Sequence, residues 1–305
     1  MINPTKKLLI TGGSGFVGRN IIAQLHQERP DIAIYNMSSS PVPLEYVNNI
    51  TIDARHFDKS LVADDFDYII HSLALSNQHY CKDLDAAIDV NVTFTKQLFD
   101  VACTQQHLQK IIHISSIILY SSDTTPPVRE DAQLNINHTT YSFTKGLAES
   151  YASFYHETFK LPVLVFRLAN IYGPYQQIAG SPFLVPSKIA DALAGKPVEL
   201  FNGSIYRDWI YSEDAARAIV SGLDSNMTGV ANLATGTGTS AGDIGREIAE
   251  QLGVPYHSLD QPVSGPTNFY CDITRISSEL GWSPRVSLTN GLTRTIEYAR
   301  TSLHI

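Results

Sequence analysis

Short apolar runs separated by polar joints dominate the first half of the chain. They lie at residues 8–10, 32–37, 49–52, 67–73, 110–115 and 162–169. A strand that helices cover on both faces is apolar on both faces, so these nearly continuous runs predict a parallel sheet between two helix layers. Helical periodicity near 83–105 and 142–159, and more weakly near 58–64, predicts the covering helices. This alternation predicts an α/β fold with a doubly wound parallel sheet.

A glycine-rich stretch joins the first apolar run to the first helical pattern. It reads Thr-Gly-Gly-Ser-Gly-Phe-Val-Gly over residues 11–18, and apolar side chains at helical spacing follow at Val17, Ile21, Ile22 and Leu25. Gly12 suits a tight turn, Gly15 a close approach to a pyrophosphate, and Gly18 close packing of the helix against the strand. An ordinary glycine-rich turn is the alternative. With strand and helix in register, the stretch predicts a Rossmann dinucleotide site to which Phe16 and Val17 contribute.

The pattern becomes less regular after Gly173-Pro174, where proline and glycine are frequent. Two later helices, near 240–252 and 288–302, predict a smaller C-terminal α/β domain that closes over the cofactor. A run at 204–211 predicts one return of the chain to the sheet. We therefore expect a dinucleotide-binding Rossmann domain at 1–170, with the return near 204–225, and a substrate domain at 171–203 and 226–305.

The end of the second strand bears on which dinucleotide is bound. An acidic residue there accepts the ribose hydroxyls of NAD, and a cation accommodates the phosphate of NADP. Residues 35–40 contain neither. Asn36 can hydrogen-bond a hydroxyl and would not repel a phosphate, so we expect NAD without excluding NADP. Asp53 closes the third strand and is expected either to accept from the adenine amino group or to cap a turn.

Composition and charge limit the kinds of partner that the protein can bind. With 43% hydrophobic and 17% charged residues, the chain has the composition of a soluble globular protein. A formal net charge of -8 without clustered Lys and Arg argues against nucleic acid as the main partner. Cys81, Cys103 and Cys271 lack the spacing of a metal site or disulfide framework, and no apolar run is long enough for a membrane span. We expect a cytoplasmic protein without a metal.

Tyr141 and Lys145 stand four residues apart in a helical pattern, and therefore share one helix face. A nearby cation lowers the pKa of a phenol, so the pair is a plausible general base. The alternative is a solvated Lys beside a packed Tyr. Ser116 favours the catalytic interpretation, because it ends a strand whose carboxyl end should lie at the same crevice and could hold a substrate oxygen.

These residues resemble a known family, the extended short-chain dehydrogenases, often called NAD-dependent epimerase/dehydratases, which act mainly on nucleotide sugars. The resemblance covers nearly the whole chain. It rests on seven ordered matches besides Asn91: the glycine motif at 11–18, I-H-S-L-A at 70–74, S-S-I-I-L-Y at 115–120, Y-S-F-T-K at 141–145, R-L-A-N-I-Y-G-P at 167–174, R-D-W-I-Y at 207–211 and the closing segment at 272–284.

The resemblance implies roles for individual residues. Ser116, Tyr141 and Lys145 would be catalytic, and Lys145 would also hold the nicotinamide ribose. Leu73 and Ala74 would line the cofactor site, where Asn91 would give support. Three further residues would contact substrate, namely Ser76, Asn170 and Arg207. A homodimer through the helices at 83–105 and 142–159 is also implied.

The chain departs from the family pattern at the substrate site. Many sugar-nucleotide epimerases have an Asn where Phe183 stands, and an Arg in the stretch that corresponds to 261–266, where this chain has none. Both residues hold the substrate diphosphate, so a substrate smaller than a nucleotide sugar also remains open. Ile117 and Ile118 occupy positions where 4,6-dehydratases of the family place Asp-Glu. The removal of water requires this additional acid and base, so we expect no dehydratase activity in this protein.

Three classes of function follow. The first is C4 epimerisation of a nucleotide sugar by transient hydride transfer. The second is a one-way NAD(P)-dependent ketoreductase or dehydrogenase of a nucleotide sugar or smaller carbonyl compound. The third is a non-catalytic dinucleotide-binding protein, which the presence of Ser116, Tyr141 and Lys145 argues against. We expect the first.

Overall fold

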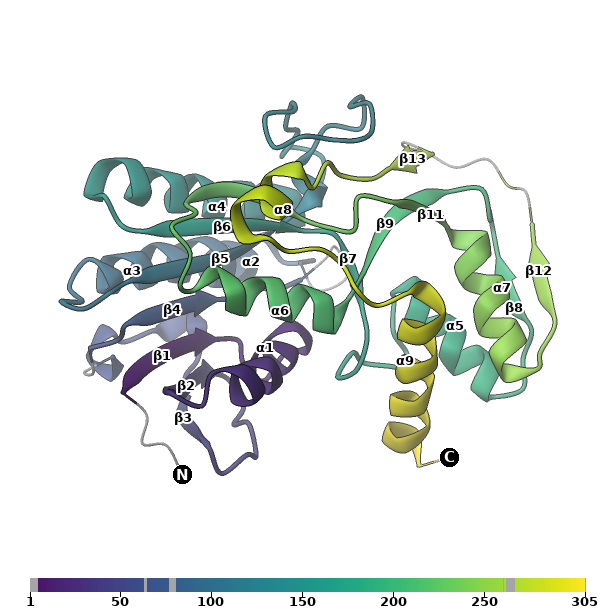
Figure 1. Ribbon diagram of the computed structural model, residues 1–305, viewed down its shortest axis with the longest axis horizontal. Helices are drawn as coiled ribbons and strands as arrows, with labels where there is room; N and C mark the ends of the chain where they lie inside the picture. The colour runs from purple at the N-terminus through teal and green to yellow at the C-terminus, as the bar shows by residue number, and fades with distance from the viewer. Residues whose placement is uncertain (1–4, 63–64, 77–80, 260, 262–266, 305) are drawn as a thin grey trace.

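The computed structural model describes residues 5–304, except 63–64, 77–80, 260 and 262–266. The chain forms two lobes (Figure 1): a large lobe around a long parallel sheet, and a smaller lobe of short strands and helices. None of the described helices has the length and apolar character that crossing a membrane would require.

The large sheet contains seven parallel strands in the order β10-β6-β5-β4-β1-β2-β3. Their bounds are β1 Lys6–Thr11, β2 Ile32–Ser38, β3 Val47–Thr51, β4 Tyr68–His71, β5 Lys110–Ser116, β6 Val163–Leu168 and β10 Gly229–Leu233. The strand order reverses between β1 and β4, which opens a crevice at the carboxyl ends of the strands. The expected doubly wound Rossmann fold is confirmed.

Helices cover both faces of this sheet (Figure 1). One face carries α1 (Phe16–Glu28) and α6 (Ser212–Gly222), which pack against each other. The other face carries α3 (Phe94–Ala102) and α4 (Thr140–Phe159). Leu8 and Ile10 belong to the first core, whereas Leu9 between them belongs to the second. Two buried faces explain why the strands are apolar without alternation.

The helix expected at 83–105 consists of three successive pieces. It begins as α2 (Leu84–Ile88), widens into the π-helical turn η3 (Asp89–Thr93) and continues as α3 to Ala102. The weak helix expected near 58–64 is wrong in type, because the described part forms only the 3-10 turn η2 (Lys59–Leu61), capped by Asp58. This segment is exposed, so no apolar face favours a longer helix.

The smaller lobe contains two small sheets and a helical layer. β9 (Tyr206–Tyr211) pairs with β7 (Asn170–Tyr172), β11 (Gly238–Ser240) and β13 (Asn268–Phe269). β8 (Val198–Leu200) pairs with β12 (Tyr256–Ser258). Three helices, α5 (Leu184–Leu193), α7 (Ala241–Leu252) and α9 (Leu288–Leu303), share one core. Helix α8 (Thr274–Leu280) packs instead against β10 and α6 of the large lobe.

The return of the chain to the large sheet differs from expectation. The run at 204–211 was expected to make that return, but β9 belongs to the second sheet. The return is made by α6 and then by β10, which pairs with β6 along 229–233. The buried Asp208 of β9 still connects the lobes, because its carboxylate accepts from the backbone N–H groups of Thr235 and Gly236 after β10.

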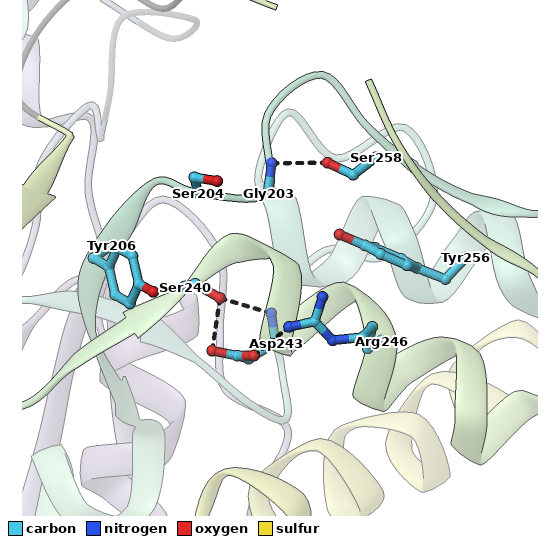
Figure 2. Close-up of a pocket in the computed structure, with 8 residues that line it drawn as sticks. All are labelled: Gly203, Ser204, Tyr206, Ser240, Asp243, Arg246, Tyr256 and Ser258. Carbon is cyan, nitrogen blue, oxygen red and sulfur yellow. Dashed lines mark hydrogen bonds and ion pairs between the residues drawn. The ribbon is translucent and has the colours of Figure 1, made fainter. Parts of the chain in front are cut away.

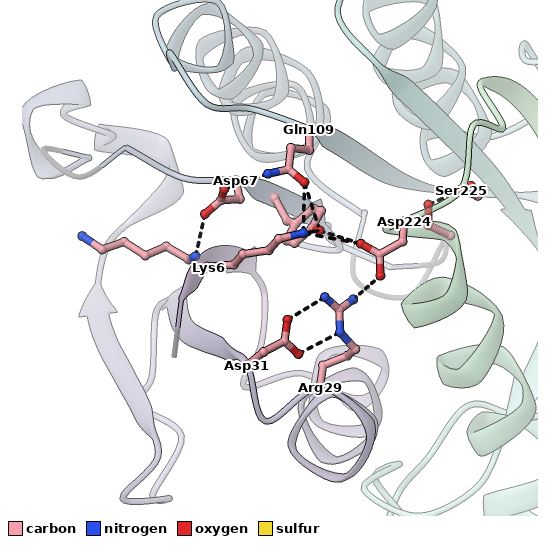
Figure 3. A network of polar contacts seen from close by, with 10 residues as sticks. Lys6, Arg29, Asp31, Asp67, Gln109, Asp224 and Ser225 are labelled. Atoms are coloured by element: carbon pink, nitrogen blue, oxygen red, sulfur yellow. Dashed lines mark hydrogen bonds and ion pairs between the residues drawn. The ribbon is translucent and has the colours of Figure 1, made fainter. Parts of the chain in front are cut away.

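A polar network joins the amino ends of neighbouring strands (Figure 3). Lys6 of β1 donates to the Tyr68 hydroxyl of β4 at 2.5 Å, and this hydroxyl donates to Asp224 at 2.6 Å. Arg29, at the end of α1, pairs with Asp224 at 2.7 Å and with Asp31 at 2.9 Å. Since Asp224 follows α6, the network fastens α1 and α6 to the end of the sheet opposite the crevice.

Candidate active site

A cavity of about 1220 Å³ lies where the crevice of the large sheet meets the smaller lobe. Single-ligand pockets measure roughly 300 to 1,000 Å³, so this cavity has room for two small molecules. Most of the predicted site residues line it: Gly12, Gly15, Phe16, Val17, Ala74, Ser76, Ser116, Tyr141, Lys145, Asn170 and Arg207. Four others, Asn36, Asp53, Leu73 and Asn91, do not. No Asp or Glu is present among the described lining residues.

A second cavity of about 280 Å³ lies in the smaller lobe (Figure 2). Ser240 caps α7 by accepting from the N–H of Asp243 at 2.9 Å, and Asp243 pairs with Arg246. The Gly203 N–H donates to the Ser258 hydroxyl at 3.0 Å. These groups satisfy one another, and this cavity shares no lining residue with the large one.

The glycine loop brings backbone close to backbone at the start of the large cavity. Gly12 has a φ of +74°, and a Cβ there would lie 2.7 Å from the Leu73 Cα. A Cβ on Gly18 would collide with the Gly12 carbonyl oxygen, so both expected glycine roles are visible. The first turn of α1 faces the cavity with no acidic residue and no side-chain cap. Such a helix start suits a pyrophosphate.

Ser116 and Tyr141 both line the large cavity. Ser116 ends β5 and starts the 3-10 turn η4 (Ile117–Leu119), in which its Oγ accepts from the N–H of Ile118 at 3.2 Å. The Ser116 hydroxyl is therefore free to donate, and its effect on Tyr141 is to lower the pKa of the phenol. Burial is the larger effect and raises the pKa of Tyr141 to about 12.

Lys145 lies one turn beyond Tyr141 on α4 and is 4% exposed. Its Nζ donates to the Ile114 carbonyl oxygen at 2.5 Å, and burial lowers its pKa to about 8. We expected Lys145 to lower the pKa of Tyr141. In this structure the amine is turned toward the Ile114 carbonyl, and the effect of Lys145 on the phenol stays a prediction.

Helix α4 is fixed in register against β5 by a buried ion pair. Glu149 accepts from the Ser115 hydroxyl at 2.6 Å and pairs with Arg167 of β6 at 2.6 Å. At its start, Thr139 caps α4 by accepting from the N–H of Ser142 at 3.0 Å. Because Ser115 precedes Ser116, the ion pair sets the position of the catalytic strand end relative to the helix that carries Tyr141.

Asn91 supports the site without lining it. Its carboxamide oxygen accepts from the Leu75 N–H at 2.7 Å, and its amide donates to the Thr144 hydroxyl of α4 at 3.0 Å. It lies in the π-helical turn η3 and is 1% exposed. Asn91 therefore ties the loop that carries Ser76 to the catalytic helix, so it is a positioning residue.

Two buried histidines lie behind the catalytic strand. His71 Nδ1 is 2.7 Å from the Thr11 hydroxyl, and its Nε2 is 2.8 Å from the Thr95 hydroxyl. Both ring nitrogens of His113 on β5 are buried without a partner. Burial lowers the pKa of His71 to about 3 and that of His113 well below its usual value. Both rings are therefore neutral in the folded protein at neutral pH.

Asn36 and Asp53 are engaged elsewhere. The Asn36 carboxamide is 1% exposed, donates to Asn49 at 2.9 Å and accepts from the Ser38 hydroxyl at 3.0 Å. This arrangement does not support the expected contact between Asn36 and a ribose hydroxyl. Asp53 caps the 3-10 turn η1 (Ala54–His56) and pairs with Arg55 at 2.8 Å, as in the second of its two expected roles.

Among the described residues, the substrate side of the cavity has one arginine and the start of a helix. Arg207 lines it, with one hydrogen bond to the Tyr206 carbonyl at 2.8 Å, and burial lowers its pKa. Phe183, at the N-cap of α5, provides no capping hydrogen bond. Gln261 is described but the remainder of the stretch 261–266 lies outside the described residues.

Sequence reasoning missed three polar residues of this wall. Gln176 is buried with an unpartnered Oε1, and Trp209 has an unpartnered Nε1. Trp209 lies inside the quoted R-D-W segment, so its position could have indicated it. His138 also lines the cavity, three residues before Tyr141. No spacing rule points to a single His in a loop, and only the fold places it there.

Comparison with known proteins decides the family. The family model described as the NAD dependent epimerase/dehydratase family matches residues 8–234. The chain belongs to this family. It is therefore an enzyme of the extended short-chain dehydrogenase class, and its cofactor is NAD.

Relatives of this family member carry out different reactions. The UDP-glucose 4-epimerase of Mycolicibacterium smegmatis is 27% identical, over 96% of this chain and 98% of the relative. The dTDP-glucose 4,6-dehydratase of Streptomyces niveus is 28% identical, over 96% of this chain and 93% of the relative. The structure of UDP-glucuronic acid 4-epimerase from Bacillus cereus, with UDP-glucuronic acid and NAD, matches with a TM-score of 0.86 at 26% identity, covering 97% of this chain and 99% of that one.

Proposed function

We propose that this protein catalyses C4 epimerisation of a nucleotide sugar. The observation that carries the proposal is that Ser116 and Tyr141 line one cavity whose described wall contains no carboxylate. Epimerisation needs one proton-transfer group at the reacting oxygen. Removal of water needs a further acid and base, and Ile117 and Ile118 stand beside Ser116 instead. The epimerases among its relatives support the same reaction.

The residues of the cavity fit the cofactor. The first turn of α1 would hold the pyrophosphate, and the glycine loop leaves space that side chains would fill. Ala74 would lie against the nicotinamide half, and Lys145 would hydrogen-bond its ribose. NAD, when bound, supplies the reversible oxidant for a carbinol carbon.

Tyr141 handles the proton of the sugar hydroxyl. In this structure its phenol keeps its proton at neutral pH, because burial raises the pKa to about 12. The base form requires a cation nearer the phenol, and Lys145 is the candidate since both side chains share one face of α4. Movement of its Nζ away from the Ile114 carbonyl would lower the pKa of Tyr141. Ser116 meanwhile donates to the sugar oxygen and orients it.

The nucleotide half would occupy the side of the cavity next to the smaller lobe. Arg207 provides the cation for a diphosphate, and the first turn of α5 adds backbone N–H groups without an acidic residue. Leu184 and Phe269 give the same wall an apolar part. A single arginine is a weak diphosphate site, which keeps one-way reduction of a smaller carbonyl substrate as the second candidate.

Product analysis tests this proposal. Purified protein is incubated with UDP-glucose and separately with UDP-galactose, without added coenzyme, and followed by NMR and by absorbance of reduced nicotinamide. We expect each sugar to yield its C4 epimer with no net change in that absorbance. In a separate reaction with a 4-keto sugar and added NADH, stoichiometric consumption of the NADH would favour the reductase instead. Formation of a 4-keto-6-deoxy sugar would contradict the exclusion of dehydration.

We also propose that the protein is a homodimer through the α3–α4 face. Phe154 and Phe159, at the end of α4, are 51% and 53% exposed and pack edge to face against each other. Exposed aromatic pairs on a helix face are typical of an interface. A second copy of the chain would cover them.

A cytoplasmic location is supported by the cysteines. All three are free thiols, and Cys81 and Cys271 are buried. Unpaired buried thiols suit a reducing compartment. Fractionation of the native host would test this location.

A further inference from the structure

The segment from Ser121 to Thr139 forms a polar wall along the large cavity. Its cavity residues are Ser121, Ser122, Asn135, His138 and Thr139. The cavity wall beside Ser116 is apolar, because Ile117 and Ile118 line the cavity there. A sugar whose reacting hydroxyl binds Ser116 and Tyr141 can therefore hydrogen-bond to the polar wall, in addition to Ser76, Asn170 and Gln176, which also line the cavity.

His138 is the one imidazole among the described lining residues. Its Nδ1 lies 2.9 Å from the carbonyl oxygen of Asn135. A carbonyl oxygen only accepts, so Nδ1 carries the hydrogen, and Nε2 of the neutral ring is an acceptor. No described residue hydrogen-bonds this Nε2, and the side chain is exposed.

The position of His138 determines which substrate groups its Nε2 can contact. His138 comes directly before Thr139, the N-cap of α4, and Tyr141 lies in the first turn of that helix. The ring is held to Asn135, and so it enters the cavity as a preoriented acceptor, with little side-chain entropy left to lose. A polar group that is fixed before binding discriminates strongly between substrates that do and do not satisfy it.

We propose that His138 is a substrate-specificity residue whose Nε2 accepts a hydrogen bond from a sugar hydroxyl on a ring carbon next to the reacting one. This inference rests on the proposed function, because it requires a sugar at Ser116 and Tyr141. No covalent step is involved. His138 would therefore affect sugar affinity and the choice between sugars, and would leave coenzyme binding unchanged.

Two substitutions separate the contact from the structural role of the ring. His138→Asn keeps a donor near Nδ1 for the Asn135 carbonyl but removes the Nε2 position. His138→Gln places an amide at that position. Each is made in the Tyr141→Phe background with NAD present, and binding of UDP-glucose and UDP-galactose is measured by calorimetry. We expect His138→Asn to weaken sugar binding about tenfold and His138→Gln to weaken it less than threefold, with equal melting temperatures.

Monodeoxy analogues of UDP-glucose, lacking the 2-, 3- or 6-hydroxyl, complete the test. The hydroxyl next to the reacting C4 is that of C3, so we expect the 3-deoxy analogue to bind about tenfold more weakly than UDP-glucose to the His138 protein. The 3-deoxy analogue and UDP-glucose should bind with equal affinity to the His138→Asn protein. Unchanged sugar affinity in His138→Asn would overturn this inference and leave the proposed function standing. Failure of every nucleotide sugar to bind the Tyr141→Phe protein would overturn both.

Discussion

Burial at Tyr141 and Lys145 acts on the two side chains in opposite directions. It raises the pKa of the phenol to about 12 and lowers that of the amine to about 8, so both groups are driven toward their neutral forms. A protonated phenol is ready to donate to a carbonyl oxygen. The structure therefore shows the site in its acid form, and a charge brought into the cavity is needed to produce the base.

Replacing Tyr141 by Phe tests the proton carrier. The substitution removes the phenolic oxygen and little volume, so turnover should fall by at least 10³-fold, roughly the contribution of a general acid–base group. NAD affinity, measured by calorimetry, should change less than threefold. Ser116→Ala is the matched comparison, and we expect a smaller loss because Tyr141 remains. Turnover within a few fold of the unmodified enzyme would remove Tyr141 from its assigned role.

Lys145→Met tests the cost of burying the amine. The folded pKa is about 8 against 10.5 for an unburied Lys. Below pH 8 the amine is charged in both the folded and the unfolded protein, so the full cost of burying the charge lowers stability. Between pH 8 and 10.5 the amine is neutral in the folded protein but still protonated in the unfolded chain. Stability of the unmodified protein should thus rise with pH in this window. We expect Met to raise the unfolding free energy by about 1 to 2 kcal/mol at pH 7, after loss of the Ile114 hydrogen bond.

Urea denaturation from pH 7 to 10.5 measures this effect. The advantage of the Met variant should shrink as the pH rises above 8, while its affinity for NAD should be lower at every pH. An advantage that stays constant with pH would show that burial of charge is not its cause. Lys96→Met, on the exposed face of α3, serves as control and should show no such pH dependence.

His113→Leu tests a buried ring that has no partner. The pKa of His113 lies well below 6.5 in the folded protein, so as the pH falls through 6.5 the unfolded chain binds a proton that the folded one refuses. The unmodified protein should lose stability on acidification, and the variant less. At pH 7.5 the variant should be more stable by about 1 kcal/mol, because two unsatisfied nitrogens are removed. Denaturation at pH 7.5 and 5.5, with the exposed His107→Gln as control, measures both effects.

Residues tied to backbone geometry could be predicted from the sequence, whereas side-chain orientation could not. Gly12 and Gly18 are defined by the strand and helix around them, and Ser116 by the end of its strand. The neutral residues around Asn36 in the sequence suggested that its carboxamide is available to bind a ribose hydroxyl. Its actual partners include Asn49 on the adjacent strand, which no local pattern reveals. The amine of Lys145 likewise turns toward Ile114, a choice that depends on packing.

At the scale of elements, long apolar runs and strong helical periodicity predicted the sheet and α4. The pattern failed where an element is short or carries little periodic signal. β10 reads Gly-Val-Ala-Asn-Leu and owes its place to pairing with β6. The π-helical turn η3 has the same periodicity as a continuous helix, so its widened geometry was invisible. It became evident only from the backbone of the structure.

Asn91→Ala tests the role of this turn. The substitution leaves the Leu75 N–H and the Thr144 hydroxyl without their partner, which should lower the unfolding free energy by about 2 to 3 kcal/mol. Turnover should fall through misplacement of the loop that carries Ser76. Asn91→Asp keeps the acceptor for Leu75, so it should retain more stability than Ala. Equal stability of Ala and the unmodified protein by urea denaturation would contradict the positioning role.

At the scale of the whole molecule, the exposed end of α4 is the testable surface. Phe154→Glu places a charge at the centre of the aromatic pair with Phe159, and we expect it to convert a dimer into a monomer in sedimentation velocity. Melting of the monomer should then be independent of protein concentration. Phe201→Glu, at a residue that is 71% exposed in the smaller lobe, is the matched control and should leave the dimer intact. A monomeric unmodified protein would refute the proposed assembly.

The position of β10 at the edge of the large sheet also affects how the chain folds during its synthesis. Residues 169–228 separate β6 from its outer neighbour, so the ribosome must add 60 residues before that neighbour exists. At a synthesis rate of about 5 to 20 residues per second, the interval is roughly 3 to 12 s. During it, the buried apolar strand Val163–Leu168 has an unpaired edge, the feature that invites aggregation. Nascent chains arrested between these strands should therefore recruit chaperones, and chains released beyond Leu233 should not.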